Sequence, residues 1–453
     1  MNLPDYFLAD LPPEARLGPT MITEACQALR RNRARYLAPC STLSLIETLG
    51  DVAANWLQPH DPFRQLALRR GPAATGFSEA TLRNGLDTFF RTLTAEGLRT
   101  WVEQDLGHLD RLDRFVASEP EQASQRTALA TGPELLIHVA AGNLPIPAFR
   151  SIVSGLLMKS AQFVKCATGT SLLPRLFAHS LYAVEPKLAS CIEIAEWKGG
   201  TPALEEVLFS EADCVTATGT DETLAAVRSR LPARVRFVGY GHRVSFGYVA
   251  REVLSKSEAK QVAERAARDI VAWNQHGCLS PHAFYVEEGG SVTPSQFAEV
   301  LAGALARHEL SEPRGELSAF EAAAIASRRR LCEIRAAASP DTQMWHSEGS
   351  TAWTVIYEAN PLFQLSCLNR FIYVKAVNDP DGALHGAAAV QNQVSTVALA
   401  SFGDRGRELA AAFARWGALR VCPIGRMQDP PPAWRHDGRP ALGELITWTD
   451  WEH

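Results

Sequence analysis

Apolar positions follow two different patterns along the chain. Over roughly the first 125 residues they recur at helical spacing, and from Glu134 they change to short apolar runs: ELLIHVAA, QFVKCA, SCIEIAEW, CVTATG and VRFVGYG. Stretches with helical spacing separate these runs, at 148–160, 172–184 and 221–231. Strands that alternate with helices in this way are typical of βαβ units. The pattern therefore predicts a mainly parallel α/β domain after a helical N-terminal region.

A second α/β region is predicted from Ser257 onwards. It contains helices at 294–307 and around 316–338, and strands in the segments TAWTVIYE and FIYVKAV. The C-terminal ALGELITWTDWE alternates apolar and polar residues, as a half-buried or edge strand does. We expect a helical N-terminal region packed on the cofactor domain, a cofactor-binding domain, a catalytic domain and a C-terminal extension, at 1–130, 131–250, 251–425 and 426–453.

One cysteine follows a long amphipathic helix directly. Ser255 and Glu258 form a Ser-x-x-Glu capping box at the start of this helix, and apolar residues then recur on one face. We predict that the helix ends at Gly277, because glycine adopts left-handed backbone angles without strain. Cys278 then lies on a tight turn before a strand that starts at Ala283. Such a thiol is a candidate nucleophile, although cysteines more often serve as small apolar filler.

Composition excludes several classes of protein. A net charge of −5 gives no overall basic field for a nucleic acid, and no apolar run is long enough to span a bilayer. The start of the chain lacks the basic flank and apolar core of a secretory signal. The nine cysteines are odd in number and include no Cys-x-x-Cys pair, which disfavours a disulfide framework and a structural metal site. We therefore expect a cytoplasmic protein.

Polar residues follow two of the predicted strands. The loop Gly142–Pro145 comes after the first strand, and the next strand ends at Lys165. The carboxyl ends of parallel strands face the ligand crevice of an open sheet. Asn143 could stabilise an oxyanion and Lys165 could bind a ribose or phosphate. A helix-capping asparagine and a surface lysine are the alternatives.

The turn Thr218-Gly219-Thr220 precedes another predicted helix. Backbone amides at a helix start can hold a phosphate, but a simple helix cap explains the same residues. The chain has no Gly-x-Gly-x-x-Gly before a helix, so the usual dinucleotide fingerprint is absent.

Together these motifs resemble a known superfamily. Asn143 with Pro145, Lys165, the Thr218 turn, Asn274-Gln275-x-Gly277-Cys278 and Glu358-x-x-Pro361 occur in the order found in aldehyde dehydrogenases. The segments Trp273 to Pro281 and Gly241-x-Arg243-x-Ser245-Phe246 resemble more closely the acyl-CoA reductases of the LuxC type, the fatty-acid reductases associated with bacterial luciferase. The resemblance covers about residue 130 to the end.

The resemblance implies a fold and a set of roles. The fold would be aldehyde dehydrogenase-like, with two open, mainly parallel α/β domains and a terminal strand that pairs across a subunit interface in a homodimer or homotetramer. Cys278 would accept the acyl group, with Asn143 and the Cys278 amide binding the oxyanion. The cofactor would contact Lys165, Thr168, Thr218, Gly219, Thr220 and Glu358. An acyl-protein synthetase is a possible partner.

Two departures from the dehydrogenase pattern bear on the reaction. The stretch Gly241 to Phe246 has no carboxylate where many aldehyde dehydrogenases carry a glutamate base, and an acyl-enzyme that is to be reduced must not be hydrolysed. Thr168 stands where NAD-preferring relatives often have an acidic residue, so a ribose 2′-phosphate would not be repelled. These departures favour thioester reduction with NADPH, with NADH as the alternative.

We therefore expect an NADPH-dependent reductase that converts an acyl-CoA or carrier-bound acyl thioester to an aldehyde. His242 or His276 could assist proton transfer. An aldehyde dehydrogenase working in the oxidising direction and a non-catalytic scaffold for an acyl carrier or synthetase are the alternatives.

Overall fold

The chain forms two compact units. The computed structural model describes residues 3–12 and 14–452; residues 1–2 and 453, at the ends of the predicted N-terminal region and C-terminal extension, and Pro13 lie outside the described residues. The first unit contains the described residues up to Thr75, Leu86–Gly241 and the residues from Pro431. The second contains Gly76–Gly85 and His242–Pro430. The first unit thus combines most of the predicted N-terminal region with the predicted cofactor domain and the C-terminal extension. The boundaries of the second unit lie after residues 241 and 430 rather than after 250 and 425, and residues 76–85 also join it.

A parallel five-stranded sheet forms the centre of the first unit, in the order β4-β3-β2-β5-β6. Its strands are β2 (Leu135–Val139), β3 (Ala161–Cys166), β4 (Ile192–Glu196), β5 (Cys214–Thr218) and β6 (Arg236–Tyr240). The strand order reverses between β2 and β5, because β3 and β4 extend the sheet to one side and β5 and β6 to the other. Ligands of open α/β sheets bind at such a point, beyond the carboxyl ends of the strands.

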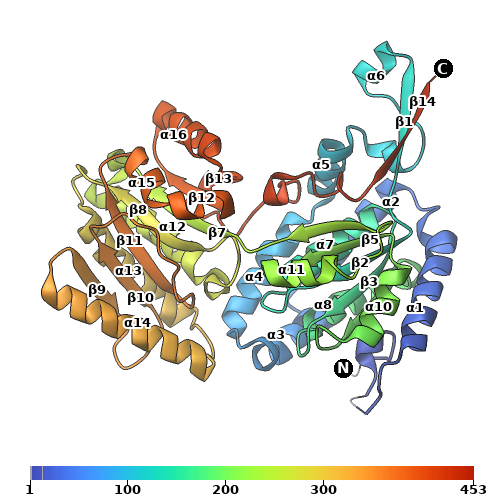
Figure 1. Cartoon of the computed structure of the whole chain (residues 1–453), viewed down its shortest axis with the longest axis horizontal. Coiled ribbons are helices and arrows are strands. Elements are labelled where there is room, and N and C mark those ends of the chain that lie inside the picture. The colour runs from blue at the N-terminus through green and yellow to red at the C-terminus, as the bar shows by residue number, and fades with distance from the viewer. Residues whose placement is uncertain (1–2, 13, 453) are drawn as a thin grey trace. The chain divides into compact units, whose positions relative to one another are not determined.

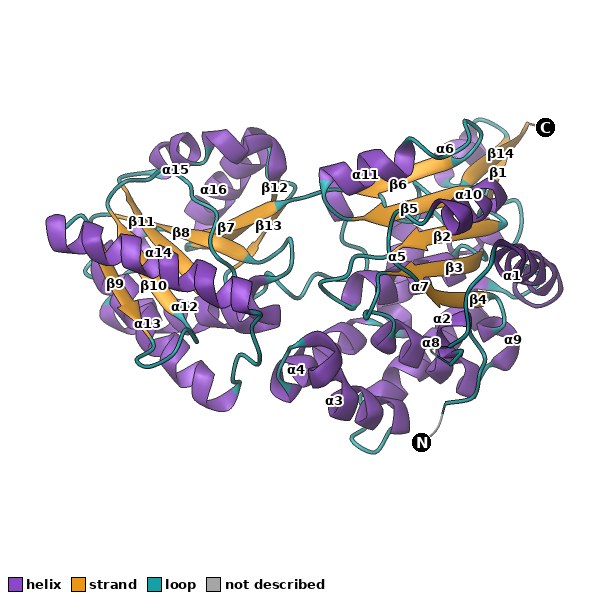
Figure 2. Ribbon diagram, turned by 60° about the horizontal axis from the view of Figure 1, so that its bottom comes forward, coloured by secondary structure: helices purple, strands orange, loops and turns teal. Residues whose placement is uncertain are grey.

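Helices cover both faces of this sheet (Figure 2). On one face lie α1 (Pro19–Asn32), α10 (Pro202–Glu211) and α11 (Asp221–Arg228). On the other lie α7 (Ile146–Leu157) and α8 (Leu172–Val184), with α2 (Thr42–Trp56) and α3 (Pro62–Thr75) packed against them. The remaining α-helices of this unit are α5 (Ala95–Leu106), α6 (Glu119–Ala123) and α9 (Pro186–Ala189). Helix α4 (Glu79–Thr92) belongs to the second unit up to Gly85 and to the first from Leu86. The predicted helical N-terminal region thus contributes a layer beneath the sheet.

A separate two-stranded ribbon belongs to the first unit. β1 (Arg126–Thr131) pairs antiparallel with β14 (Thr447–Glu452), and the ribbon projects from the rest of the unit (Figure 1). All six residues of β14 are exposed, and Trp448 and Trp451 have exposed fractions of 44% and 55%. The predicted C-terminal strand therefore exists, and it leaves two large aromatic side chains in solvent.

The second unit is built on a seven-stranded sheet in the order β13-β12-β7-β8-β11-β10-β9, parallel except for the edge strand β9. Its strands are β7 (Val244–Val249), β8 (Pro281–Glu287), β9 (Thr342–His346), β10 (Thr354–Glu358), β11 (Phe371–Val377), β12 (Val394–Ala400) and β13 (Arg420–Pro423). The central strands β7, β8, β10 and β11 are buried along their whole length. That burial requires helices on both faces.

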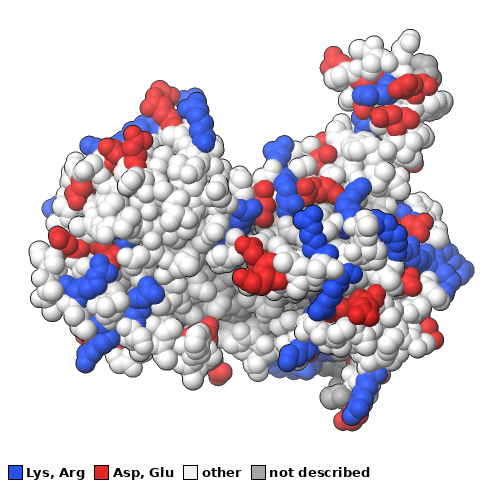
Figure 3. Space-filling view, in the orientation of Figure 1, with Lys and Arg blue, Asp and Glu red and all other residues white. Residues whose placement is uncertain are grey.

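Two helical layers supply this cover. On one face lie α12 (Lys256–Val271) and α13 (Pro294–Ser311), and on the other α14 (Ala319–Ala338), α15 (Pro380–Gly386) and α16 (Gly403–Trp416). None of the described helices is long and apolar enough to cross a membrane. On the face shown in Figure 3, acidic and basic side chains are interspersed and form no continuous basic surface. The predicted α/β fold with two mainly parallel sheets is confirmed.

Candidate active site

The candidate residues are divided between the two units. In the first unit, three of them lie at one edge of the sheet. Asn143 follows β2, Lys165 pairs in register with Val139 near the end of β3, and Thr218 ends β5. Because β3, β2 and β5 are neighbours, the structure brings these residues to the same carboxyl edge, at the point where the strand order reverses.

A pocket opens at this edge. It is lined by the loop Ala140–Pro145, by Cys166, Gly169 and Thr170 after β3, by the start of α8 and by Ala74 and Thr75 at the end of α3. Asn143 and Thr168 are exposed on the two loops. The helical N-terminal region therefore supplies part of the pocket wall.

Lys165 brings a positive charge to this edge. Its side chain is buried, and its ammonium lies 5.8 Å from the centre of the Trp197 ring. Burial lowers the pKa of Lys165, while the nearby Glu205 and Glu196 carboxylates act in the opposite direction. A buried lysine with its charge at the ligand edge can pair with a ribose or phosphate group.

Glu196 brings a carboxylate to the Thr168 loop. It ends β4, and its two oxygens accept hydrogen bonds from the backbone amides of Gly169 (2.7 Å) and Ser171 (3.1 Å). The sequence argument for NADPH rested on the absence of an acidic residue at Thr168. In the structure a carboxylate does lie at this loop, but it belongs to Glu196 of the neighbouring strand β4. Inspection of the Thr168 segment alone could not identify it.

The Thr218 turn forms a helix cap. The Thr220 hydroxyl accepts a hydrogen bond from the Thr223 amide at 3.3 Å, and Asp221 and Glu222 occupy the first turn of α11. These carboxylates already face the positive end of the helix dipole. The edge as a whole still fits a nicotinamide nucleotide, since a pocket, a buried cation and a polar loop converge at the reversal of strand order.

The nucleophile turn of the second unit begins earlier than predicted. Helix α12 ends at Val271 rather than at Gly277. Trp273, Asn274 and Gln275 have φ of 52°, 48° and 65°, so three consecutive residues with side chains occupy the left-handed region that Gly277 was expected to provide. Tertiary hydrogen bonds hold Asn274 and Gln275 there, which explains why the sequence did not show the break.

Several hydrogen bonds fix the backbone around Cys278. The buried Ser245 hydroxyl donates to the Cys278 carbonyl at 2.7 Å and accepts from the Thr396 amide at 3.1 Å. The Gln275 side chain donates to the Pro281 carbonyl at 2.8 Å, and the Ser280 amide donates to the Gly277 carbonyl at 2.9 Å. Cys278 thus lies half-buried on a turn that is held at both ends.

The other eight cysteines have one electrostatic property in common. Burial raises the thiol pKa of each of them, to about 12 for four and about 11 for two. The thiolate is the nucleophilic form, so these eight side chains are held in the unreactive one. Their positions are Cys26, Cys40, Cys166, Cys191, Cys214, Cys332, Cys367 and Cys422.

Three histidines lie near this turn. His242 is exposed at the start of β7, and His276 is half-buried with Nε2 3.0 Å from Asn369 Oδ1. His282, which the sequence argument did not single out, is buried on β8, and its Nδ1 accepts a hydrogen bond from the Ser366 amide at 3.1 Å. Burial, with a smaller effect of His242, lowers the pKa of His282 to about 4. His282 is therefore a neutral imidazole at physiological pH.

Glu358 is not brought to the Cys278 turn. It ends β10, level with Lys375 of β11 and Tyr285 of β8, whereas Cys278 precedes the first residue of β8. Its buried carboxylate pairs with the buried Lys375 and lies 2.6 Å from Arg335. The segment that does meet the turn is the loop before β11, through the hydrogen bonds of Asn369 and Arg370 to Asn274.

Comparison with known proteins agrees with this arrangement. The profile of the acyl-CoA reductase (LuxC) family matches residues 37–448. This chain belongs to that family. The match begins well before residue 130, where the motifs start, so much of the helical N-terminal region is also part of the family fold.

Individual relatives are named as acyl-protein thioester reductases. A long-chain acyl-protein thioester reductase 2 of Photobacterium leiognathi is 23% identical over 354 residues, covering 78% of this chain and 70% of its own length. A long-chain acyl-protein thioester reductase of Photorhabdus laumondii is 21% identical over 414 residues, covering 90% and 82%. Both are named as reductases, the class of enzyme expected for this chain.

Solved structures establish the aldehyde dehydrogenase-like fold. An NAD-dependent benzaldehyde dehydrogenase from Corynebacterium glutamicum has a TM-score of 0.70 at 14% identity, covering 97% of this chain and 91% of its own. The Delta-pyrroline-5-carboxylate dehydrogenase of Mycobacterium tuberculosis has a TM-score of 0.68 at 14% identity, covering 96% and 83%. The predicted fold class is thereby confirmed.

Proposed function

We propose that this protein reduces an acyl thioester, either an acyl-CoA or a carrier-bound fatty acyl group, to an aldehyde through an acyl-enzyme at Cys278. The observation that carries the proposal is the half-buried Cys278, on a turn held by hydrogen bonds, in a chain of the acyl-CoA reductase family. The relatives act, by their names, on long-chain acyl-protein thioesters. A carrier-bound acyl group is therefore a substrate class to test beside CoA esters.

The chemistry begins at the Cys278 sulfur. It forms a bond to the thioester carbonyl carbon, and the carbonyl oxygen takes up the electron pair of the π bond. Collapse of this tetrahedral species breaks the bond to the departing sulfur, which leaves as a thiolate and takes up a proton. The product is an acyl group joined to Cys278 by a thioester bond, so the exchange itself neither oxidises nor reduces the substrate.

Reduction requires a hydride donor. When bound, a reduced nicotinamide supplies the hydride that takes the acyl group to the aldehyde level. Hydride addition to the acyl carbon leaves a thiohemiacetal oxyanion on Cys278. Its oxygen re-forms the carbonyl, the carbon–sulfur bond breaks, and the aldehyde leaves with the enzyme thiolate restored. The Cys278 amide and the Asn143 side chain are the proposed oxyanion donors, a function for which loss of one donor typically costs about 3–4 kcal/mol in barrier.

Lys165 and Thr168 are the proposed contacts for the cofactor ribose, and Thr218 to Thr220 lie at the same edge. We infer that NADPH is preferred, because Lys165 offers a cation to a 2′-phosphate. The Glu196 carboxylate is the feature that favours NADH, although two backbone amides already occupy its oxygens. The proposal assigns no cofactor role to Glu358, whose carboxylate is buried in ion pairs.

Exposed aromatic residues support an assembly. The ribbon strand β14 presents Trp448 and Trp451 to solvent. We propose that this strand packs on a second copy of the chain, giving a homodimer or a homotetramer. A synthetase that delivers the acyl group is a further proposed partner.

Intact mass tests the acyl-enzyme. Wild-type protein is incubated without nicotinamide with butanoyl-, octanoyl- and hexadecanoyl-CoA, and we expect a single acyl adduct that hydroxylamine removes. Cys278→Ala removes the adduct, whereas Cys367→Ala, which deletes another half-buried thiol of the same unit, keeps it. Addition of NADPH converts the adduct to aldehyde.

Three outcomes would contradict the proposal. An adduct that survives Cys278→Ala places the chemistry elsewhere. Release of free acid as the main product indicates a hydrolase or an oxidising dehydrogenase. Absence of any adduct, with the protein folded, favours a binding scaffold.

A further inference from the structure

Two left-handed turns are hydrogen-bonded to each other close to Cys278 in the chain. Trp273–Gln275 form the first, and Leu368, Asn369 and Arg370, with φ of 57°, 54° and 66°, form the second. The Asn369 amide donates to the Asn274 carbonyl at 2.8 Å. Residues with side chains avoid this backbone region unless their surroundings impose it, and such residues cluster at functional sites.

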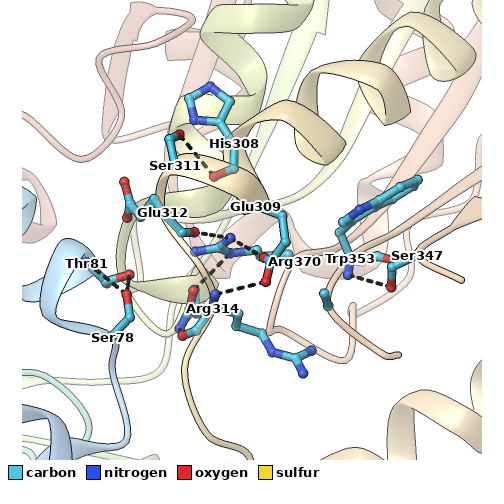
Figure 4. Close-up of polar contacts among 12 residues, drawn as sticks. Ser78, Thr81, His308, Glu309, Ser311, Glu312, Arg314, Ser347, Trp353 and Arg370 are labelled. Carbon is cyan, nitrogen blue, oxygen red and sulfur yellow. Dashed lines mark hydrogen bonds and ion pairs between the residues drawn. The ribbon is translucent and has the colours of Figure 1, made fainter. Parts of the chain in front are cut away.

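A closed ring of hydrogen bonds holds the first turn. Arg370 Nε donates to Asn274 Oδ1 at 3.0 Å, and Asn274 Nδ2 donates to the Arg314 carbonyl at 2.7 Å. The Arg314 amide donates to Glu309 Oε1 at 3.3 Å, and Arg370 Nη1 donates to Glu309 Oε2 at 2.7 Å, which returns to Arg370. Figure 4 shows the Arg370 guanidinium between Glu309 and Glu312, with Arg314 beside it.

Arg370 is the centre of this ring. Its side chain is fully buried, and its Nη1 also donates to the Glu312 carbonyl at 2.7 Å. An arginine is suited to the position because its planar fork reaches several acceptors in fixed directions, which lysine cannot do. The guanidinium therefore determines the place of the Asn274 side chain and of the backbone that carries it.

A short length of backbone connects this ring of hydrogen bonds to Cys278. Asn274 precedes Cys278 by four residues, and Gln275 ties the turn to the Pro281 carbonyl on the far side of Cys278. The Trp273 ring packs edge-on against Phe77, with the ring centres 5.3 Å apart. Cys278 thus lies between Asn274, which the hydrogen-bond ring holds, and Pro281, which is held by Gln275.

We propose that Arg370 and Asn274 are positioning residues that hold the Cys278 turn in the geometry needed for acyl transfer. This inference rests on the proposed acyl-enzyme at Cys278. It predicts that loss of the Arg370–Asn274 contact slows acyl transfer far more than it weakens thioester binding, because a displacement of about 1 Å at the reacting atom costs roughly a hundredfold in rate.

Single-turnover acylation by octanoyl-CoA, or by whichever of the three acyl-CoA probes acylates wild type fastest, tests the role. Arg370→Met and Asn274→Leu are expected to lower the maximal rate about a hundredfold, with the half-saturating concentration changed by less than about twofold. Asn274→Asp retains the acceptor for Arg370 and is expected to stay within about tenfold of wild type. The double variant Arg370→Met/Asn274→Leu is expected to acylate no more slowly than either of its single variants, because both changes remove the same contact.

Arg329→Met is the matched control. Arg329 is another buried arginine of the second unit. It donates to Thr354 Oγ1 at 2.8 Å and to the Ser350 carbonyl at 2.6 Å, and its other side-chain hydrogen bonds go to Ser347 and Trp353 rather than to the turn. A purely structural effect would lower thermal stability and acylation alike in both arginine variants. Equal acylation rates for folded Arg370→Met and Arg329→Met would overturn the proposal. If Arg370→Met yields no folded protein, the test is the comparison of Asn274→Leu with Asn274→Asp. Equal acylation rates for these two variants would overturn the proposal.

Alkylation separates this inference from the proposed function. Iodoacetamide labelling of Cys278, followed by peptide mass across a pH series, needs no substrate. We expect the profile to shift by more than about half a pH unit in Arg370→Met and Asn274→Leu but not in Arg329→Met, since the dipoles around the sulfur move with the turn. An unchanged profile in both ring variants overturns the inference even when wild type forms an acyl adduct. A shifted profile without any wild-type adduct leaves the positioning intact and removes the proposed function.

Discussion

Gly85 provides the sharpest test of how the N-terminal region supports the nucleophile turn. It lies within α4, and a Cβ atom added there would be 2.0 Å from Trp273 Cζ2 and 2.4 Å from Cε2. Non-bonded carbons settle at about 3.5–4.0 Å, so the indole or the helix must move by roughly 1.5 Å. Trp273 is 5% exposed and has little space to yield.

The magnitude for Gly85→Ala follows from two opposing effects. Replacement of a helical glycine by alanine stabilises by about 0.5–1 kcal/mol, whereas overpacking a filled site costs about 1–3 kcal/mol. We expect a net loss of about 1–2 kcal/mol in the free energy of unfolding. Gly303→Ala in α13 is the matched control, because the nearest atom to its added Cβ is Arg307 Nη1 at 3.5 Å. That variant should gain about 0.5–1 kcal/mol.

Thermal unfolding followed by circular dichroism measures the difference. For a unit of this size each kcal/mol moves the midpoint by about 2–4 °C, so the two variants should differ by roughly 3–12 °C. Acylation of Cys278 should also slow in Gly85→Ala, since Trp273 starts the left-handed turn. If Gly85→Ala is as stable as Gly303→Ala and acylates at the same rate, α4 does not support the turn and the packing argument is refuted.

Three further predictions concern other features of the chain. Burial lowers the pKa of His138 to about 4 from about 6.5. Between these pH values the unfolded state binds more protons than the folded one, so the free energy of unfolding falls as the pH drops, by up to roughly 3 kcal/mol. In urea titrations across this pH range, His138→Gln should reduce that loss of stability. Glu196→Gln should raise the ratio of kcat/KM for NADPH over NADH about tenfold, because a carboxylate no longer faces the 2′-phosphate, and an unchanged ratio would remove Glu196 from cofactor selection. Replacing Trp448 and Trp451 together by serine should shift the mass in light scattering toward the monomer at low protein concentration, with the fold preserved by circular dichroism; an unchanged mass would show that β14 does not form the subunit contact.

The regular elements of both units were predictable because burial imposes a visible pattern. The strands β2, β3 and β5 are buried for most of their length and read as apolar runs, and the predicted helix 172–184 coincides with α8. Parallel strands covered on both faces have few polar positions, so such runs separated by helices leave little choice of fold. The family resemblance rested on the residues between these elements.

Contacts across the sheet were not predictable in the same way. The carboxylate near Thr168 comes from Glu196 on β4, and the side chain that meets Asn274 comes from the loop before β11. Neither segment carries a local signal for these contacts, because their partners are set by strand order and register. Glu358 shows the opposite case, in which a local signal was present but the contact was not. Its spacing from Pro361 matches the Glu-x-x-Pro motif, whereas the strand register places it at the opposite end of the sheet from Cys278.

The end of α12 shows most clearly where local reasoning stops. Gly277 is the residue that intrinsic backbone preference selects for a left-handed turn, yet Trp273, Asn274 and Gln275 adopt it. Intrinsic preference for this region differs among residues by only about 1–2 kcal/mol, and buried hydrogen bonds can outweigh that. Asn274 receives its partner from Arg370, 96 residues further along the chain. A cysteine nucleophile can thus be recognised from its neighbours in sequence, whereas the geometry that would make it reactive depends on a residue that only the fold brings to it.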